Sequence, residues 1–428
     1  MLATTERHET AEPGSATMNI VLNHLHALLD RHRHAVRRTG VALLALAAGL
    51  LVTGATIRML RTADDAPAPL APSGTPSPTW TASVDTPVTG LAIEGEDLYV
   101  ASDQLTTFPV TCVVTVDGCS SRWRGIVPDG PLSVPTVRDE RVYLGSSEGQ
   151  LYAFPASCDG DGCPPEWVGV AGSGTVSQPA ATFDLVFATS DELYAFPTAC
   201  ASEDATCPPA WTADVPGRPA PGPPALGGGL VLVASSSSRG GISAYPAVCT
   251  DDCQPVWTGG TEGPATAVAI GEGLAYTVAR GQLIAFDLSC SGVCEPVWRG
   301  PFRNGAPFAT GAVGPPVVDG DRVLVGDDEG TLWVFRTTCE REGTRCGPID
   351  RFPVTSTALH TPQVDGDRAV ISSVGGTVAR VQLDCRPDED CDPVRVRDLG
   401  ARALAPALTA PEATIAGARN GSVEAFTW

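Results

Sequence analysis

The chain has 428 residues, of which 43% are hydrophobic and 18% are charged, with 46 Gly and 38 Pro. This composition excludes a disordered protein, and the length exceeds one small domain, so a large folded body is expected. All basic residues are Arg, and the formal net charge of −21 excludes a nucleic-acid binder, which needs a basic surface. Beyond residue 34 the only imidazole is His360 and no Lys occurs, which leaves few groups for acid–base or covalent chemistry.

An uncharged apolar run covers residues 39–57, which is long enough to cross about 30 Å of hydrocarbon as a helix. Arg31, Arg33, Arg37 and Arg38 lie directly before the run, so the positive-inside rule places residues 1–38 in the cytosol and the rest of the chain outside. We therefore expect a single-pass signal anchor in the lipid bilayer of the cell membrane. The alternative is a cleaved signal peptide, because Thr53-Gly54-Ala55 offers small residues to a peptidase. Residues 58–78 are rich in Pro and Ala and are expected to form an extended linker.

A short apolar pattern recurs about every 45 residues through residues 79–428. Leu151–Phe154 and Leu193–Phe196 both read LYAF, and each copy is a short strand that follows a turn and another strand. The eight copies end at Phe108, Phe154, Phe196, Tyr245, Phe286, Phe335, Val381 and Phe426.

Cysteines follow the same repeat, because in seven units one Cys comes four residues after the pattern and a second comes within seven more. The pairs are Cys112 with Cys119, Cys158 with Cys163, Cys200 with Cys207, Cys249 with Cys253, Cys290 with Cys294, Cys339 with Cys346, and Cys385 with Cys391. A zinc site would need two pairs brought together, whereas these pairs belong to separate units. An exported domain favours structural disulfides, with zinc or free thiols as alternatives.

A Trp stands four residues after the second Cys in five of the units, at Trp123, Trp167, Trp211, Trp257 and Trp298. Four antiparallel strands in each of eight units predict an all-β fold, an eight-bladed β-propeller preceded by a transmembrane helix. The eighth unit stops at Trp428, before its fourth strand, and Trp80 precedes the first unit. We therefore expect residues near Trp80 to complete the eighth blade and close the ring; a seven-bladed ring with a spare unit is the alternative.

Other motifs give weaker signals. Asp159–Gly162 and Asp319–Asp321 resemble fragments of calcium loops, but Asp-Gly is ordinary turn chemistry between strands. Asn420-Gly421-Ser422 has the form of a glycosylation acceptor, yet it lies where a hairpin turn is expected. His360 is expected near the central channel, in a hydrogen-bonded structural role or as a ligand-binding or metal-binding residue. We assign no catalytic, cofactor-binding or metal-ligating residue.

The repeat resembles the PQQ-like, quinoprotein-type β-propellers, whose units carry an Ala in the third strand and a docking Trp in the fourth. The matching alanines are Ala153, Ala195, Ala244, Ala285 and Ala425, and the Trp residues named above match the docking position, with Trp80 added for the closing strand. This chain departs from the family where a Cys-bracketed hairpin replaces the usual Thr-Gly turn. For the family's enzymes the resemblance implies PQQ, calcium, an Asp base and adjacent Cys residues, and none of these transfers to a matching residue here.

Non-catalytic members of that family are scaffolds in envelope protein assembly and extracytoplasmic sensor domains. The sequence therefore favours a membrane-anchored, extracytoplasmic interaction scaffold that is not an enzyme, uses no cofactor and binds an envelope protein. A ligand-sensing ectodomain is the alternative, although its small-molecule ligand is unknown and residues 1–38 are too short for a catalytic output domain. A PQQ-dependent oxidoreductase is the third hypothesis.

Overall fold

The structure is a computed structural model that describes residues 77–112, 119–128, 130–200, 205–250, 253–302, 314–338, 346–384, 394–411 and 413–428. All of these belong to one compact unit, Pro69–Trp428. The expected cytosolic segment, the apolar run and the linker up to residue 76 lie outside the described residues. Within the described ranges, no helix is long and apolar enough to span a membrane.

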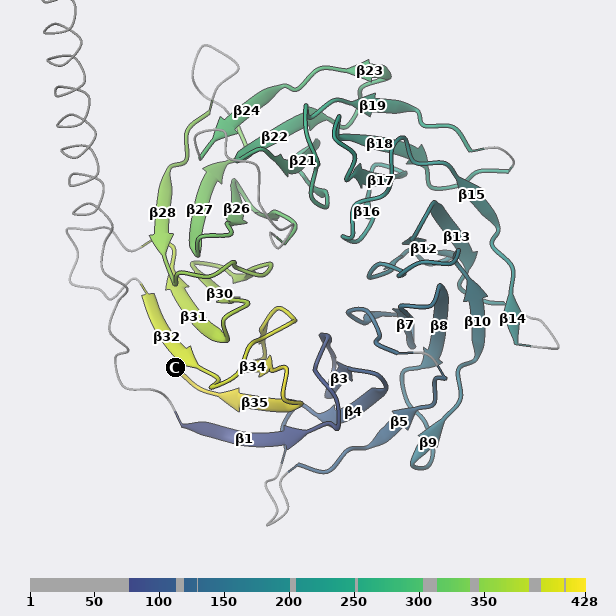
Figure 1. The fold of residues 1–428 in the computed structure, drawn as a ribbon, viewed down its shortest axis with the longest axis vertical. Helices are drawn as coiled ribbons and strands as arrows, with labels where there is room; N and C mark the ends of the chain where they lie inside the picture. Colours follow the sequence, from purple (N-terminus) through teal and green to yellow (C-terminus); the bar gives the residue numbers. More distant parts are fainter. Residues whose placement is uncertain are drawn as a thin grey trace, which may run out of the picture. The chain divides into compact units, whose positions relative to one another are not determined.

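Eight antiparallel sheets are arranged in a ring, with the first strand of each innermost (Figure 1). Four strands form each blade. Blade 1 holds β2 (Gly90–Glu94), β3 (Asp97–Ala101), β4 (Leu105–Pro109) and β5 (Trp123–Gly125). Blade 2 holds β6 (Thr136–Arg138), β7 (Arg141–Gly145), β8 (Gln150–Pro155) and β10 (Trp167–Val170). Blade 3 holds β11 (Ala180–Ala181), β12 (Leu185–Thr189), β13 (Leu193–Pro197) and β15 (Trp211–Ala213), and blade 4 holds β16 (Ala225–Gly227), β17 (Leu230–Ser235), β18 (Gly241–Pro246) and β19 (Trp257–Gly259).

The second half of the ring repeats this order. Blade 5 holds β20 (Ala269–Gly271), β21 (Leu274–Ala279), β22 (Gln282–Asp287) and β24 (Trp298–Pro301). Blade 6 holds β25 (Val317–Asp319), β26 (Arg322–Gly326), β27 (Thr331–Arg336) and β28 (Asp350–Pro353), and blade 7 holds β29 (Gln363–Asp365), β30 (Arg368–Ser372), β31 (Thr377–Gln382) and β32 (Val394–Asp398). Blade 8 holds β33 (Leu408–Thr409), β34 (Thr414–Gly417), β35 (Ser422–Phe426) and β1 (Pro78–Ser83). The predicted eight-bladed propeller is confirmed.

Ring closure follows the predicted scheme, because β1 from the N-terminal side is the outermost strand of blade 8. Trp80 pairs with Ala425 across β1 and β35, as Trp167 pairs with Ala153 in blade 2. The closing strand therefore has the same register as a continuous blade. β1 begins at Pro78, one residue before the expected start of the propeller at residue 79.

The core lies between the blades, because alternate residues of each third strand pack to opposite sides. In β8, Ala153 packs with Phe196 toward blade 3, whereas Phe154 packs with Trp123 of blade 1. The described residues form eight apolar clusters of this kind, one at each joint between neighbouring blades. Burial on both faces explains why the repeated pattern is continuously apolar instead of alternating with polar residues.

The six Trp residues assigned to blade docking lie in these joints, and none is more than 6% exposed. Trp123, Trp167 and Trp257 each contact a Phe of the next blade, with ring centroids 6.1–6.4 Å apart. Two residues after the Trp, a Gly lies directly against the same ring. A Cβ added at this Gly would collide with the ring in four joints: Gly125 with Phe154, Gly169 with Phe196, Gly259 with Phe286, and Gly300 with Phe335. The Gly therefore sets the close approach of neighbouring blades.

Substituting Gly259→Ala is expected to lower the free energy of unfolding by about 1–3 kcal/mol, because the added methyl group overpacks the joint against Phe286. Denaturant unfolding of the purified protein measures the change. The adjacent Gly260→Ala is the matched control, since a Cβ there meets no atom within 4 Å. Equal stability of the two variants would show that the ring of Phe286 does not fix the spacing.

Candidate interaction surface

Multiple disulfides lie on the outer rim. The structure joins five of the seven predicted pairs, with Cα–Cα distances of 5.8–6.3 Å: Cys112–Cys119, Cys158–Cys163, Cys200–Cys207, Cys249–Cys253 and Cys290–Cys294. Cys346 is also disulfide-bonded. Cys339, Cys385 and Cys391 lie outside the described residues.

In five units the second Cys, or the short strand that contains it, reaches back to the preceding blade, a contact that the sequence did not predict. Three short strands that contain it pair in parallel with the outermost strand of that blade: β9 (Gly162–Cys163) with β5, β14 (Thr206–Cys207) with β10, and β23 (Gly292–Cys294) with β19. We call these segments straps. Exposed strand edges attract further strands, so the straps protect the rim from unwanted pairing.

Two further joints show the same hydrogen bond without a full strand. The N–H of Cys119 donates to the carbonyl of Thr81 in β1 at 3.2 Å. The N–H of Cys346 donates to the carbonyl of Arg299 in β24 at 2.9 Å. Both acceptors follow a docking Trp by one residue. The second Cys therefore has two roles, closing its own hairpin and bonding to the neighbouring blade.

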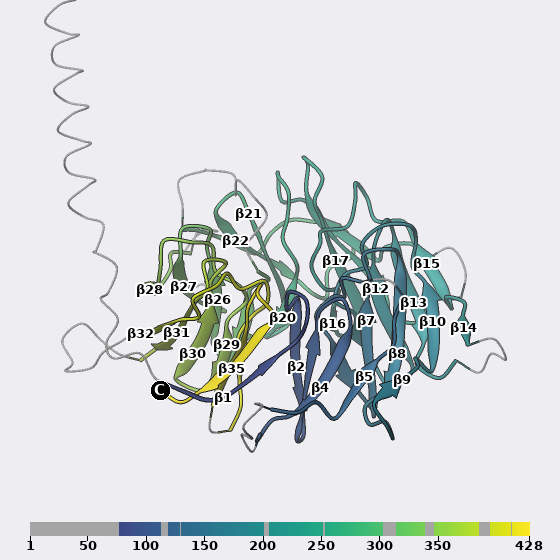
Figure 2. The ribbon, with the colours of Figure 1, turned by 60° about the horizontal axis from the view of Figure 1, so that its bottom comes forward.

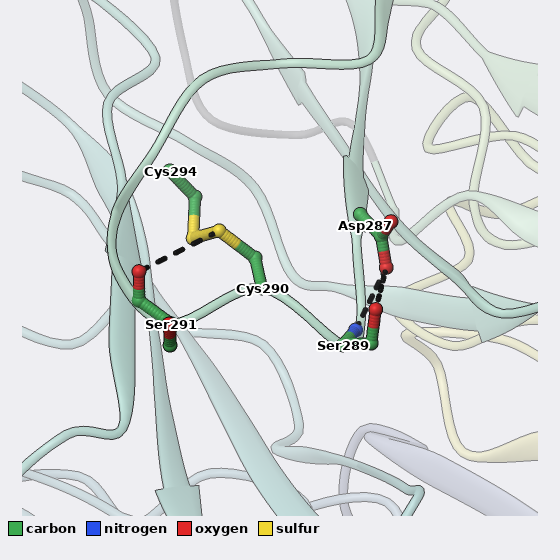
Figure 3. The surroundings of a disulfide bond; sticks show 5 residues. All are labelled: Asp287, Ser289, Cys290, Ser291 and Cys294. Carbon is green, nitrogen blue, oxygen red and sulfur yellow. Dashed lines mark hydrogen bonds between the residues drawn. A yellow bond between two sulfur atoms is a disulfide. The ribbon is translucent and has the colours of Figure 1, made fainter.

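The turn that enters the Cys290–Cys294 disulfide is held by a polar contact (Figure 3). The backbone N–H and the hydroxyl of Ser289 donate to one carboxylate oxygen of Asp287 at 2.8 and 2.7 Å. These hydrogen bonds hold the pKa of Asp287 below its usual range, so the carboxylate stays ionised in the fold. The disulfide thus starts from a fixed turn at the end of β22.

One side of the ring, which we call the hairpin face, carries the turns between first and second strands and the disulfide-closed connections between third and fourth strands. These connections share a side because successive antiparallel strands alternate in direction (Figure 2). Acidic residues outnumber arginines in the described first turns of the hairpin face: Glu94, Glu96, Asp97, Asp139, Glu140, Asp184, Glu272, Asp319, Asp321, Asp365 and Asp367 against Arg138, Arg141, Arg322 and Arg368.

Large apolar side chains are also exposed on the hairpin face. Phe183, in the turn between β11 and β12, is 73% exposed, and Val248 and Val293, in disulfide-closed connections, are 78% and 84% exposed. These residues belong to the consecutive blades 3, 4 and 5. The hairpin face therefore presents both apolar and acidic side chains to solvent.

Asn420, Asp319 and Asp321, which the sequence offered as candidates for glycosylation or calcium binding, form hydrogen bonds or ion pairs within the fold. Asn420 lies in the turn between β34 and β35, where its side-chain oxygen accepts the N–H of Ser422 at 3.1 Å. Asp319 and Asp321 form ion pairs with Arg322 and Arg336 at 3.0 and 2.7 Å. No cluster of His, Cys, Asp and Glu that could hold a metal ion occurs among the described residues.

His360 lies in the loop before β29, where its Nε2 is 3.3 Å from the carbonyl of Ala403 in the corresponding loop of blade 8. Burial lowers the pKa of the imidazole, and the hydrogen bond to Ala403 opposes that shift. The ring therefore links the inner loops of blades 7 and 8, which matches the structural alternative given above for this residue.

No protein-family model and no curated protein sequence matches the chain. Solved structures are similar in fold: the computationally designed Ika8 protein, with 10% identity and a TM-score of 0.65, BamB from Moraxella catarrhalis, with 14% and 0.59, and Saccharomyces cerevisiae Sqt1, with 10% and 0.64. Each likeness covers 83% of this chain and 98–100% of the other. These likenesses show the β-propeller fold of this chain.

Replacing both Cys290 and Cys294 by Ala is expected to reduce stability by about 2 kcal/mol at most, because the disulfide closes a very short loop. The larger expected effect is local. The N–H of Gly292, which donates to the carbonyl of Val256 at 2.9 Å, should exchange with solvent faster, while the amides of β22 stay protected. Hydrogen exchange measured residue by residue tests this, and unchanged protection of Gly292 would contradict a pinning role for the disulfide.

Proposed function

We propose that this chain is a membrane-anchored, extracytoplasmic β-propeller that acts as a protein-interaction scaffold in the cell envelope. The observation that carries the proposal is the hairpin face, where Phe183, Val248 and Val293 are exposed among acidic turns. A binding surface uses exposed aromatic and aliphatic side chains of this kind as apolar anchors.

Two features support an extracytoplasmic location. The apolar run at residues 39–57 with arginines before it fits a signal anchor that leaves the propeller outside the cell membrane. Disulfides on the rim, such as Cys158–Cys163, persist in oxidising compartments and are rare in the cytosol. Both features support placement of the propeller in the envelope.

Rigidity also suits a scaffold. The joints hold each blade against the next through buried rings, and straps bond neighbouring blades along the rim. Binding by a preorganised surface loses little conformational entropy, so a modest set of contacts suffices for affinity. The propeller would therefore present its partner with fixed hairpins.

Chemical cross-linking in intact cells, followed by mass spectrometry, identifies the partner, and titration of the purified full-length chain then measures its affinity. Phe183→Ser is expected to weaken binding on the order of tenfold, as loss of an aromatic anchor does. Val170→Ser is the matched control, because Val170 is exposed at the opposite end of an outer strand. Wild-type protein that is recovered alone would count against the scaffold and favour the ligand-sensing alternative.

We also propose that the chain is not an enzyme. Full-length protein incubated with PQQ and calcium is expected to show neither cofactor binding by absorbance nor dye-linked oxidation of alcohols or sugars. The reason is that the residues implied by the family's enzymes have no matching positions here. Turnover that depends on added PQQ would overturn this part of the proposal and favour the oxidoreductase.

A further inference from the structure

The outer edge of β32 carries no strap among the described residues, as is also the case for β15 and β28. β32 pairs with β31 on one side, and in the part of the chain that the structure describes no strand pairs with its other side. Straps come from the connection between the third and fourth strands of the following blade. In blade 8 that fourth strand is β1, which enters from the N-terminal side, so no described connection crosses β32.

Blade 1 shows which backbone N–H groups on the outer edge of a fourth strand bond to a strap. The N–H groups of Arg124 and Ile126 donate to the carbonyls of Asp161 and Cys163 at 3.0 and 2.8 Å. Trp123 pairs with Thr107 as Arg395 pairs with Arg380, so the corresponding residues of β32 are Val396 and Asp398. In the described residues the N–H groups of these two have no backbone partner.

The chain's own segment before β1 is poorly suited to this edge. Pro76 stands four residues before Trp80, where the other blades have their second Cys. That Cys gives an N–H to the neighbouring strand, as Cys119 does to Thr81 and Cys346 to Arg299. Proline has no N–H and cannot form a disulfide, so a strap made by this segment would lack both the hydrogen bond and the covalent link.

Three arginines lie on the strands of this blade: Arg395 on β32, Arg380 on β31, where its guanidinium lies 5.7 Å from the ring of Trp428, and Arg368 on β30. Arg380 and Arg395 are cross-strand partners, at the positions where blade 2 has Ala153 and Trp167. Burial lowers the pKa of the Arg380 guanidinium, and the nearby charges of Arg395 and Arg368 lower it further. Within the described residues none of these three arginines forms an ion pair, although the chain carries a net charge of −21.

We propose that the free edge of β32 binds an extended acidic segment of a partner protein, which adds as a parallel fifth strand as the straps do elsewhere. Carbonyls of that segment accept the N–H groups of Val396 and Asp398, and one of its N–H groups donates to the carbonyl of Val396. Its carboxylates lie near the exposed Arg395, whose charge disfavours basic strands. This surface is separate from the hairpin face and shares with the proposed function only the existence of a protein partner.

Hydrogen exchange on the full-length chain tests whether the edge is free. The amides of Val396 and Asp398 should exchange at least about a hundredfold faster than those of Arg124 and Ile126, which are strapped. Equal protection of the two pairs would mean that the segment before β1 or a second copy already covers β32, and would overturn the proposal.

The binding test uses as its probe a capped eight-residue peptide of alternating Thr and Glu, with a peptide of alternating Thr and Arg as the charge control. Excess Thr–Glu peptide should slow exchange at Val396 and Asp398 at least tenfold, and the Thr–Arg peptide should not. Val396→Pro should abolish this protection at Asp398, because it removes an edge N–H and blocks the added strand, whereas Val396→Ala should retain it. Protection by both peptides, by neither, or in the Val396→Pro variant would refute the proposal.

A second variant separates this surface from the hairpin face. Phe183→Ser should leave peptide binding at β32 unchanged, because Phe183 lies in blade 3. Loss of peptide binding in that variant would overturn the proposal of a separate site. Conversely, a partner that is lost with Phe183→Ser and kept with Val396→Pro would uphold the scaffold and reject β32 as its docking edge.

Discussion

Closure of the ring constrains the packing between blades, because eight joints together must complete one turn. Each joint is filled by side chains from two blades, so a large residue on one side requires a small one on the other. Gly169 lies against Phe196 at one joint, whereas at the joint between blades 6 and 7 the order is reversed and Phe352 packs with Val381. In both joints a large ring on one side faces a smaller residue on the other, so the two sides of a joint complement each other.

The same constraint explains the disulfides. Strands that are buried on both faces leave only their outer edges and their turns exposed, and an open edge is the weak point of a sheet. A connection closed by a short disulfide can be held against the neighbouring edge without a larger core. The second Cys therefore does more than staple a hairpin, because its backbone N–H also joins two blades, as at Cys346 and Arg299.

The fold was predictable from the number of repeats. Eight copies of one pattern, with Trp80 standing before the first copy, leave few ways to close a ring. The straps were not predictable, because parallel pairing between β9 and β5 joins different units and leaves no periodic signal within either. The exposure of Phe183 and Val293 was not predictable either, because the sequence does not show whether an apolar residue in a turn is buried or exposed. Interaction surfaces depend on what remains uncovered after packing, and a sequence pattern reports packing alone.

The joint between blades 7 and 8 adds an ion pair and a cation–π contact to its apolar cluster. Arg397 occupies the Gly position, where it pairs with Glu424 and lies 4.8 Å from the ring of Phe426. A guanidinium over an aromatic ring fills the volume of a Trp contact while it keeps a polar group at the rim. Arg397 therefore joins blade 7 to blade 8 through an ion pair and an aromatic contact at once.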